Sequence, residues 1–213
     1  MGAPMSHDRI AIIDFETTGI SPGQGDRATE VAIVMSEGGR VVDRYQSLMN
    51  AGVRIPAFIT QLTGITNAMV QAAPPASVVM AEAARFVGDT PMVAHNAAFD
   101  RRFWQAELAL CGQPAQQTFA CTVLLSRRLY PQAPNHKLGS LIDWLGLPRS
   151  GQAHRALADA DMAAALLGRI AHDLVHSHAI ARPDHAFLRS LQTCSKAALP
   201  QFLARAATPT AMA

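Results

Sequence analysis

Two carboxylates interrupt an apolar stretch near the start of the chain, in the sequence AIIDFETTG. Asp14 and Glu16 stand two residues apart in what reads as a strand, so their side chains leave the same face with Cα atoms about 7 Å apart. Two anions on a half-buried face repel each other and lose hydration, and a divalent cation would relieve both costs. The alternative is that one acid ends the strand as a solvent-exposed turn residue.

A third carboxylate belongs to the segment MVAHNAAFDRRFW, in which a short strand leads into a helix. Asp100 falls in the first turn of that helix, after Asn96 and Phe99. An acid at this position also stabilises the helix dipole, so this carboxylate alone does not establish a site.

The segment HRALADADMAAALL adds a histidine and two more acids. His154 and Asp159 lie five residues apart, which is about 140° around an ideal helix. They can reach one site only if His154 lies on the loop before the helix, and the preceding PRSGQA is loop-like enough for that. Asp161 is rotated about 200° from Asp159 and is expected to face solvent.

The pattern of apolar residues predicts a sheet covered by helices around these segments. Three strands are expected first, as an antiparallel meander, at Arg9–Glu16, Glu30–Met35 and Val41–Met49. Two short buried strands are expected at PMVAH and QTFAC, and helices at Pro56–Leu62, Ser77–Val87, Asp100–Cys111, Thr122–Tyr130, Leu138–Leu145 and Ala156–His176. The fold class is therefore α/β, with a mixed sheet flanked by helices. The stretch GISPGQGD is expected to be a flexible loop beside the site that opens no helix.

Length and composition indicate one globular domain. The chain has 213 residues, is 49% hydrophobic and carries a formal net charge of +2, so no strong overall field predicts a nucleic-acid or membrane partner. Three cysteines without metal-ligand spacing indicate a reduced, cytoplasmic setting, and no apolar run is long enough for a membrane span. Residues 1–8 are expected to be a flexible leader, 9–176 the main domain, and 177–213 an extension that forms one or two helices and frays at its end.

The stretches DFETTG, HNAAFD and HRALAD, in this order and with these gaps, closely resemble the three motifs of the DEDDh exonuclease family. The likeness is greatest to the DnaQ-like branch, which contains the polymerase III epsilon proofreading subunit and exonuclease X. It extends to LTGIT, FACTVLLSRRLYP and HKLGSLIDWLGLP and covers Arg9 to Leu174. The resemblance implies an RNase H-like fold and a 3′–5′ exonuclease that releases nucleoside 5′-monophosphates.

The resemblance also implies a role for each motif residue. Two divalent metal ions, Mg²⁺ or Mn²⁺, would be held by four acids, namely Asp14, Glu16, Asp100 and Asp159. Asp14 would bridge the two ions and His154 would be the general base. Residues expected to contact the substrate are Thr17, Thr18, Gly19, Leu62, Ile65, His95, Asn96 and Phe99. Leu62, Ile65 and Phe99 could equally be ordinary core residues.

Single-stranded DNA is the substrate that the resemblance favours, because a deep site with stacking surfaces requires an unpaired end. The acids and the histidine alone would equally suit an endonuclease or a phosphodiesterase. RNA trimming by an enzyme of the same fold, of the RNase T or oligoribonuclease type, stays open because no local feature reads the 2′-hydroxyl. A third reading is a binding subunit of a DNA polymerase or clamp, docked through the tail that carries Gln201, Phe202 and Leu203.

Overall fold

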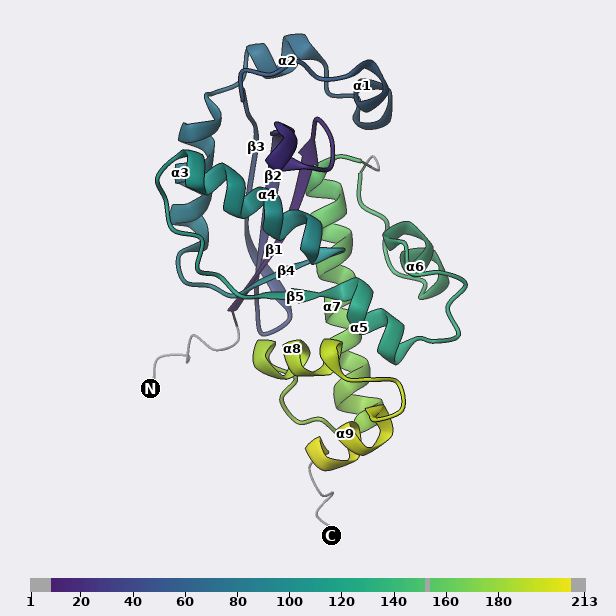
Figure 1. The fold of residues 1–213 in the computed structure, drawn as a ribbon. Coiled ribbons are helices and arrows are strands. Elements are labelled where there is room, and N and C mark those ends of the chain that lie inside the picture. Colours follow the sequence, from purple (N-terminus) through teal and green to yellow (C-terminus); the bar gives the residue numbers. More distant parts are fainter. Residues whose placement is uncertain (1–8, 152–153, 208–213) are drawn as a thin grey trace.

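The computed structural model describes residues 9–151 and 154–207, which form a five-stranded sheet with helices on both faces (Figure 1). The strand order is β3-β2-β1-β4-β5. The expected antiparallel meander consists of β1 (Arg9–Thr17), β2 (Ala28–Glu37) and β3 (Arg40–Leu48). The sheet continues in parallel with β1 through β4 (Met92–Ala94) and β5 (Phe119–Cys121). The predicted mixed sheet is confirmed.

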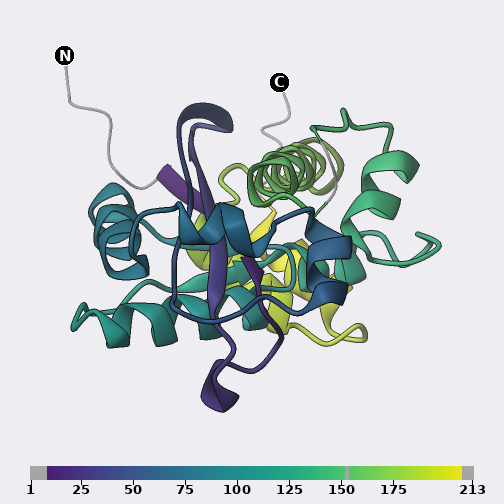
Figure 2. The same ribbon diagram turned by 90° about the horizontal axis from the view of Figure 1, so that it is seen from above.

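Two layers of helices cover the sheet. One face carries α3 (Ala76–Val87) and α4 (Ala97–Leu110), whose buried side chains join one hydrophobic core. The other face carries the long helix α7 (Ala156–His178), against which α5 (Thr122–Leu129) and α6 (Leu138–Trp144) pack. Figure 2 shows α7 nearly end on, on the opposite side of the strands from α4.

Alternate side chains of β1 enter these two cores, as the two-residue period of a strand requires. Phe15 belongs to the core on the α3 and α4 side, and Ile12 belongs to the core on the α7 side. Asp14 and Glu16 are in phase with Ile12, so they leave the face that α7 covers. The predicted shared face of the two acids is therefore confirmed.

Two short helices, α1 (Ala57–Thr63) and α2 (Asn67–Gln71), lie beyond the end of the sheet at which β1 ends (Figure 1). The first is the helix expected one residue earlier in the chain, and the second was not expected. The hydroxyl of Thr66 caps α2 by accepting from the backbone N–H of Met69 at 3.2 Å.

The stretch between β1 and β2 is a loop that leads into a strand and opens no helix, as expected, but it contains a short 3₁₀ turn, η2 (Pro22–Gln24), that was not expected. Asp26 orders this turn because its Oδ2 accepts from the backbone N–H of Ser21 at 2.9 Å. A Cβ atom on Gly19 would overlap the Asp26 carboxylate, so the close approach requires glycine. The loop beside the site is thus a folded unit.

The C-terminal part forms the two expected helices, α8 (His185–Thr193) and α9 (Leu199–Ala206). The expected boundary at residue 177 falls inside α7, and Gln192 of α8 accepts from the backbone N–H of Cys121 in β5 at 2.7 Å. The expected flexible leader, residues 1–8, and the expected frayed end, residues 208–213, lie outside the described residues. No helix in the described part of the chain is long and apolar enough to cross a membrane.

Candidate active site

The acids of β1 stand where this strand runs past its parallel neighbour β4. Pairing between β1 and β4 covers only Ala11 and Ile12, so Asp14 and Glu16 extend beyond the end of β4. In open sheets with parallel strands, ligands bind at the carboxyl ends of the strands. Glu16 is only 9% exposed and Asp14 is half-buried, so both carboxylates have limited contact with water.

Asp100 joins these acids from α4, on the other face of the sheet. Because β4 ends at Ala94, the backbone N–H of Phe15 has no strand partner on that side. Asp100 Oδ1 accepts from this N–H at 3.3 Å, and the side chain is buried. The same carboxylate therefore completes the backbone hydrogen bonding of β1 and brings a third charge to the site.

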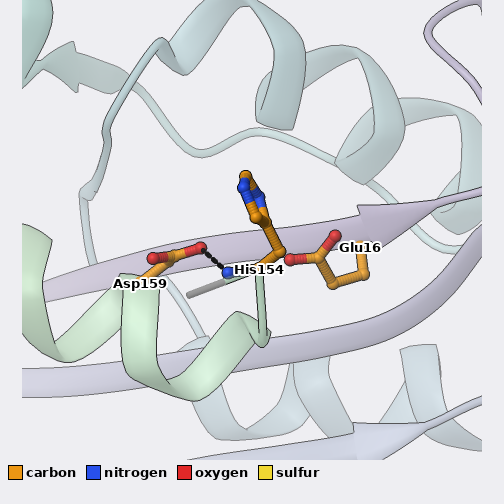
Figure 3. A group of neighbouring side chains, drawn as sticks. All are labelled: Glu16, His154 and Asp159. Carbon is orange, nitrogen blue, oxygen red and sulfur yellow. Dashed lines mark hydrogen bonds between the residues drawn. The ribbon is translucent and has the colours of Figure 1, made fainter. Parts of the chain in front are cut away.

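His154 and Asp159 come from the start of α7. The helix begins at Ala156, so His154 lies on the preceding loop, as expected. Its backbone has a positive φ of 59°, which is unusual for a residue other than glycine, and its N–H donates to Asp159 Oδ2 at 3.1 Å. Figure 3 shows the imidazole of His154 rising between the carboxylates of Asp159 and Glu16, and one ligand atom from each of the three lies within 4.8 Å of the others.

Asp161 takes no part in this cluster. Its carboxylate pairs with Arg44 of β3 at 2.9 Å, on the surface of α7. Helical geometry predicted that Asp161 faces solvent; the residue does lie away from the cluster, but its side chain is paired with Arg44 and only 21% exposed.

The acids of the cluster hold protons more tightly than ordinary carboxylic acids. Burial, followed by the charge of Asp159, raises the pKa of Glu16 to about 8. Burial raises the pKa of Asp100 to about 8 and also raises the pKa of Asp159. The pKa of Asp14 is held well above its usual range by burial and then by the charges of Asp100 and Asp159. The four acids therefore repel one another whenever they ionise together.

A divalent cation would resolve this repulsion, and the available ligand atoms suit a hard one. The cluster offers carboxylate oxygens from four acids and one imidazole, which is the kind of ligand set that Mg²⁺ and Mn²⁺ accept. The positive charge would also lower the cost of ionising all four acids at neutral pH.

Sequence reasoning missed a fifth acid, Glu30 of β2, which lies directly opposite Glu16 in the β1–β2 pairing and is fully buried. Its carboxylate pairs with Arg155 at 2.8 Å. Burial acts to raise the pKa of Glu30, but hydrogen bonds from Arg155, the Ala156 N–H and Gln46 outweigh it, so the pKa is lowered. The available signal was a single acid in the apolar run TEVAIVM.

The turn after the acids is held in shape by its own threonines. The hydroxyl of Thr17 donates to the carbonyl oxygen of Gly19, and the hydroxyl of Thr18 accepts from the N–H of Arg27 at 3.0 Å. Both side chains are buried. Any contact of Thr17, Thr18 and Gly19 with a ligand would therefore come from their backbone.

The apolar residues expected to contact substrate divide into exposed and buried members. Leu62 on α1 is 49% exposed, whereas Ile65 is fully buried in a small core beneath α1 and α2. Phe99 is half-buried, with its ring centroid 4.9 Å from that of Phe103. Sequence reasoning missed Phe58, which is 65% exposed on the same helix as Leu62. An exposed surface for a ligand is thus offered by Phe58 and Leu62, while Ile65 holds α1 in place.

His95 connects the end of β4 to the segment before α6. Its Nε2 lies 3.1 Å from the carbonyl oxygen of His136 and its Nδ1 lies 2.9 Å from the hydroxyl of Thr122. Burial lowers the pKa of His95 to about 4, so the ring is neutral at pH 7. Because a carbonyl only accepts, Nε2 carries the proton and Nδ1 accepts from Thr122. The next residue, Asn96, is exposed and has a positive φ of 74°.

A cleft of about 720 Å³ opens at the cluster. Asp14, His154 and Asp159 contribute to its lining, together with Asn96 and His95. The segment between α5 and α6 and its surroundings supply the basic part of the lining, namely His136, Lys137 and Arg149. The cleft thus combines an acidic side, suited to cations, with the positive charge of Lys137, suited to phosphates, while Arg149 pairs with Asp143 at 2.6 Å.

The chain matches the exonuclease family model (RNase_T) over residues 11–167. It is 40% identical over 159 residues to the 3′-5′ exonuclease DinG of Bacillus subtilis (strain 168), a match that covers 74% of this chain and 17% of that protein. It is 36% identical over 160 residues to the DNA polymerase III PolC-type of Clostridium perfringens (strain 13 / Type A), with 75% of this chain and 11% of that protein covered. The chain therefore spans less than a fifth of the length of these curated relatives.

A solved structure of exonuclease X in complex with 5′ overhanging duplex DNA is similar in fold as well as in sequence. The two chains have a TM-score of 0.63 and are 32% identical. The match covers 76% of this chain and 91% of that one. The arrangement of sheet and helices described above is therefore that of a DEDDh nuclease domain.

Proposed function

The chain belongs to the exonuclease family, and we propose that it is a 3′–5′ exonuclease of the DEDDh type that removes nucleoside 5′-monophosphates stepwise from the 3′ end of single-stranded DNA. The observation that carries the proposal is the cluster of four acids and one histidine at the end of β1, beside a cleft that Asp14, His154 and Asp159 line. A role as a proofreader like the polymerase III epsilon subunit is part of the proposal, supported by the match to PolC-type polymerases.

The proposed cofactors are two divalent cations, Mg²⁺ or Mn²⁺, held by Asp14, Glu16, Asp100 and Asp159. The raised pKa values of these acids support the assignment, because a metal-free cluster of this kind is electrostatically costly. When bound, such cations supply Lewis-acid stabilisation of the charge that develops on the scissile phosphate and on the leaving 3′-oxygen.

His154 is the proposed general base. Its ring is exposed to the cleft while its backbone is held by Asp159, so it is both accessible and positioned. An imidazole nitrogen with access to the cleft can accept the proton of an attacking water. The neutral ring of His95 lacks this freedom because both of its nitrogens are hydrogen-bonded inside the protein, so its proposed part is to support the cleft wall.

Exposed apolar side chains on α1 support an unpaired substrate end. Phe58 and Leu62 are four residues apart on one helical face and are 65% and 49% exposed. Unpaired bases stack on such side chains, whereas bases within a duplex are already stacked. We assign Phe58 and Leu62 to the last bases of the strand, and the backbone of Thr17 to Gly19 together with Asn96 to its terminal nucleotide.

Two further substrates compete with single-stranded DNA. RNA is one, because the acids and the histidine could act on either backbone, and discrimination requires a contact to the substrate 2′-hydroxyl. Duplex DNA with a 5′ overhang is the other, because that is the ligand of the similar exonuclease X structure. Docking on a polymerase or clamp through the C-terminal tail is less well supported, since Leu203 of that tail is buried in the core shared with α7.

Digestion of matched oligonucleotides tests the proposal. Single-stranded DNA, single-stranded RNA and a 5′ overhanging duplex of one sequence are incubated in parallel with Mg²⁺ or Mn²⁺ titrations. We expect the single-stranded DNA to be shortened fastest, with loss of activity in EDTA and in Asp14→Ala protein. Full activity of Asp14→Ala, or faster cleavage of RNA, would refute the mechanism or the substrate assignment respectively.

A further inference from the structure

We propose that the ion pair between buried Glu30 and partly exposed Arg155 is a positioning device that sets His154 against the acid cluster and keeps the Arg155 guanidinium from pairing with Glu16. This inference rests on the proposed function, since it assigns a purpose to the placement of the general base. Neither Glu30 nor Arg155 is proposed to touch the substrate.

The Glu30 carboxylate accepts four hydrogen bonds from three residues. Arg155 donates through Nε at 3.2 Å and Nη2 at 2.8 Å, the Ala156 N–H donates at 3.1 Å, and Gln46 Nε2 donates at 2.8 Å. An ionised carboxylate has about four acceptor positions, so these donors saturate it. Glu30 therefore lies next to the cluster without an oxygen available for a cation, and it is not a fifth ligand.

These contacts fix the chain immediately after the proposed base. Arg155 and Ala156 are the two residues that follow His154, and both are tied to the same carboxylate in β2. On its other side, the His154 N–H is held by Asp159. A positive φ at a residue with a side chain persists only when its surroundings over-determine it. Glu30 and Asp159 together supply that restraint.

The ion pair also controls where the Arg155 charge acts. Glu30 and Glu16 are direct partners across β1 and β2, and the charge of Arg155 acts on both acids. If Glu30 is made neutral, Glu16 is left as the acid partner of the guanidinium. The cation would then compete with Arg155 for Glu16, so metal affinity would fall. Removing both charges together would restore the affinity while leaving His154 unanchored.

A second ion pair on the same helix provides a matched control. Arg44 of β3 pairs with Asp161 of α7 at 2.9 Å, so this pair also ties the meander to the start of α7. It lies at the surface, with the Arg44 side chain 49% exposed, and among the described residues it forms no hydrogen bond or ion pair with His154 or Glu16. Arg44→Met thus removes a comparable link without touching the proposed device.

The test compares Glu30→Gln, the double variant Glu30→Gln/Arg155→Met, and Arg44→Met with the parent chain. Three quantities are measured: the amide exchange rates of His154 and Ala156, the Mn²⁺ dissociation constant by calorimetry, and kcat and KM on single-stranded DNA. We expect Glu30→Gln to exchange faster at both amides, to bind Mn²⁺ at least about fivefold more weakly, and to lose about 10- to 100-fold in kcat at nearly unchanged KM. The double variant should recover the Mn²⁺ affinity but not kcat, and Arg44→Met should match the parent.

The proposal is overturned if Glu30→Gln leaves amide exchange and kcat within about twofold of the parent, or if Arg44→Met produces the same losses. If Glu30→Gln does not fold, Arg155→Lys takes its place, since it keeps the charge but loses the two-nitrogen contact; unchanged exchange and kcat there also overturn the proposal. Amide exchange and Mn²⁺ binding need no nuclease activity. An inactive parent would therefore refute the proposed function while leaving this inference decided by the other two readouts.

Discussion

The stability of the metal-free protein should fall as pH rises from 6.5 to 8, and a divalent cation should reverse the fall. Glu16 has a pKa raised from 4.5 to about 8, so the folded state keeps a proton that the unfolded state has already released. Because the folded state binds more protons than the unfolded state, low pH favours folding. The resulting contribution to the free energy of unfolding is lost as pH rises through the folded-state pKa. Asp100, with a pKa raised to about 8, acts in the same direction.

The size of the effect follows from the pKa of Glu16. Each pH unit between the two pKa values changes the free energy of unfolding by about 1.4 kcal/mol, so the interval from 6.5 to 8 represents about 2 kcal/mol for this one group. For a chain of this size that corresponds to a fall in Tm of about 4–8 °C. The window starts at 6.5 because buried His95, with a pKa lowered to about 4, adds stability as pH rises towards 6.5 and would mask the fall.

Differential scanning calorimetry in EDTA and in excess Mn²⁺, at pH 6.5 and 8.5, measures both parts of this prediction. The cation binds ionised carboxylates, so the gain in Tm on adding Mn²⁺ should be larger at pH 8.5 than at pH 6.5. Glu16→Gln serves as the control and should lose about 2 kcal/mol of the metal-free pH dependence. A Tm in EDTA that does not fall between these pH values, or an equal Mn²⁺ gain at both, would refute the electrostatic account of the cluster.

Three other predictions concern the cleft. His154→Ala should lose about 100- to 10,000-fold in kcat, and calorimetry should still detect Mn²⁺ binding to the acids; kcat within tenfold of the parent would contradict its role as base. Phe58→Ala should raise KM for single-stranded DNA about fivefold or more at constant kcat, whereas Val78→Ala, at an apolar position 46% exposed on α3, should not; equal effects would rule out stacking on α1. Lys137→Ala should reduce the slope of log KM against log salt by about 0.7, and an unchanged slope would show that Lys137 contacts no phosphate.

Local geometry was sufficient to predict the part of the site that lies on single elements. The two-residue period of a strand put Asp14 and Glu16 on one face, and the structure places both there. The angle between His154 and Asp159 required His154 to precede the helix, and α7 does begin at Ala156. Helical rotation likewise sent Asp161 to the surface, where it meets Arg44.

Contacts between distant segments could not be predicted in the same way. The pairing of Glu30 with Arg155 joins residues 125 positions apart. Its proposed effect on the acid cluster depends on the β1–β2 register, which places Glu30 opposite Glu16. The hydrogen bond from Phe15 to Asp100 depends on where β4 stops, which is a property of the assembled sheet.

The apolar contacts were ambiguous for a similar reason. Leu62 and Ile65 are both apolar and lie in one short segment, but only the orientation of α1 decides that the first is exposed and the second buried. Phe58 was not predicted as a contact residue because an aromatic side chain on a short helix is normally expected to be buried in the core. The ordering of the loop before β2 by Asp26 likewise depends on its close approach to Gly19.

On the proposed function, the cluster cleaves nucleic acid from its 3′ end one nucleotide at a time. The most direct measurement uses single-stranded DNA that carries a label in its 3′-terminal nucleotide, incubated with Mn²⁺, with the first labelled product identified by chromatography. We predict that the label appears first as a nucleoside 5′-monophosphate, and that Asp14→Ala protein releases none. Label that appears first in longer oligonucleotides, or equal release of the label by Asp14→Ala protein, would contradict stepwise cleavage from the 3′ end by this cluster.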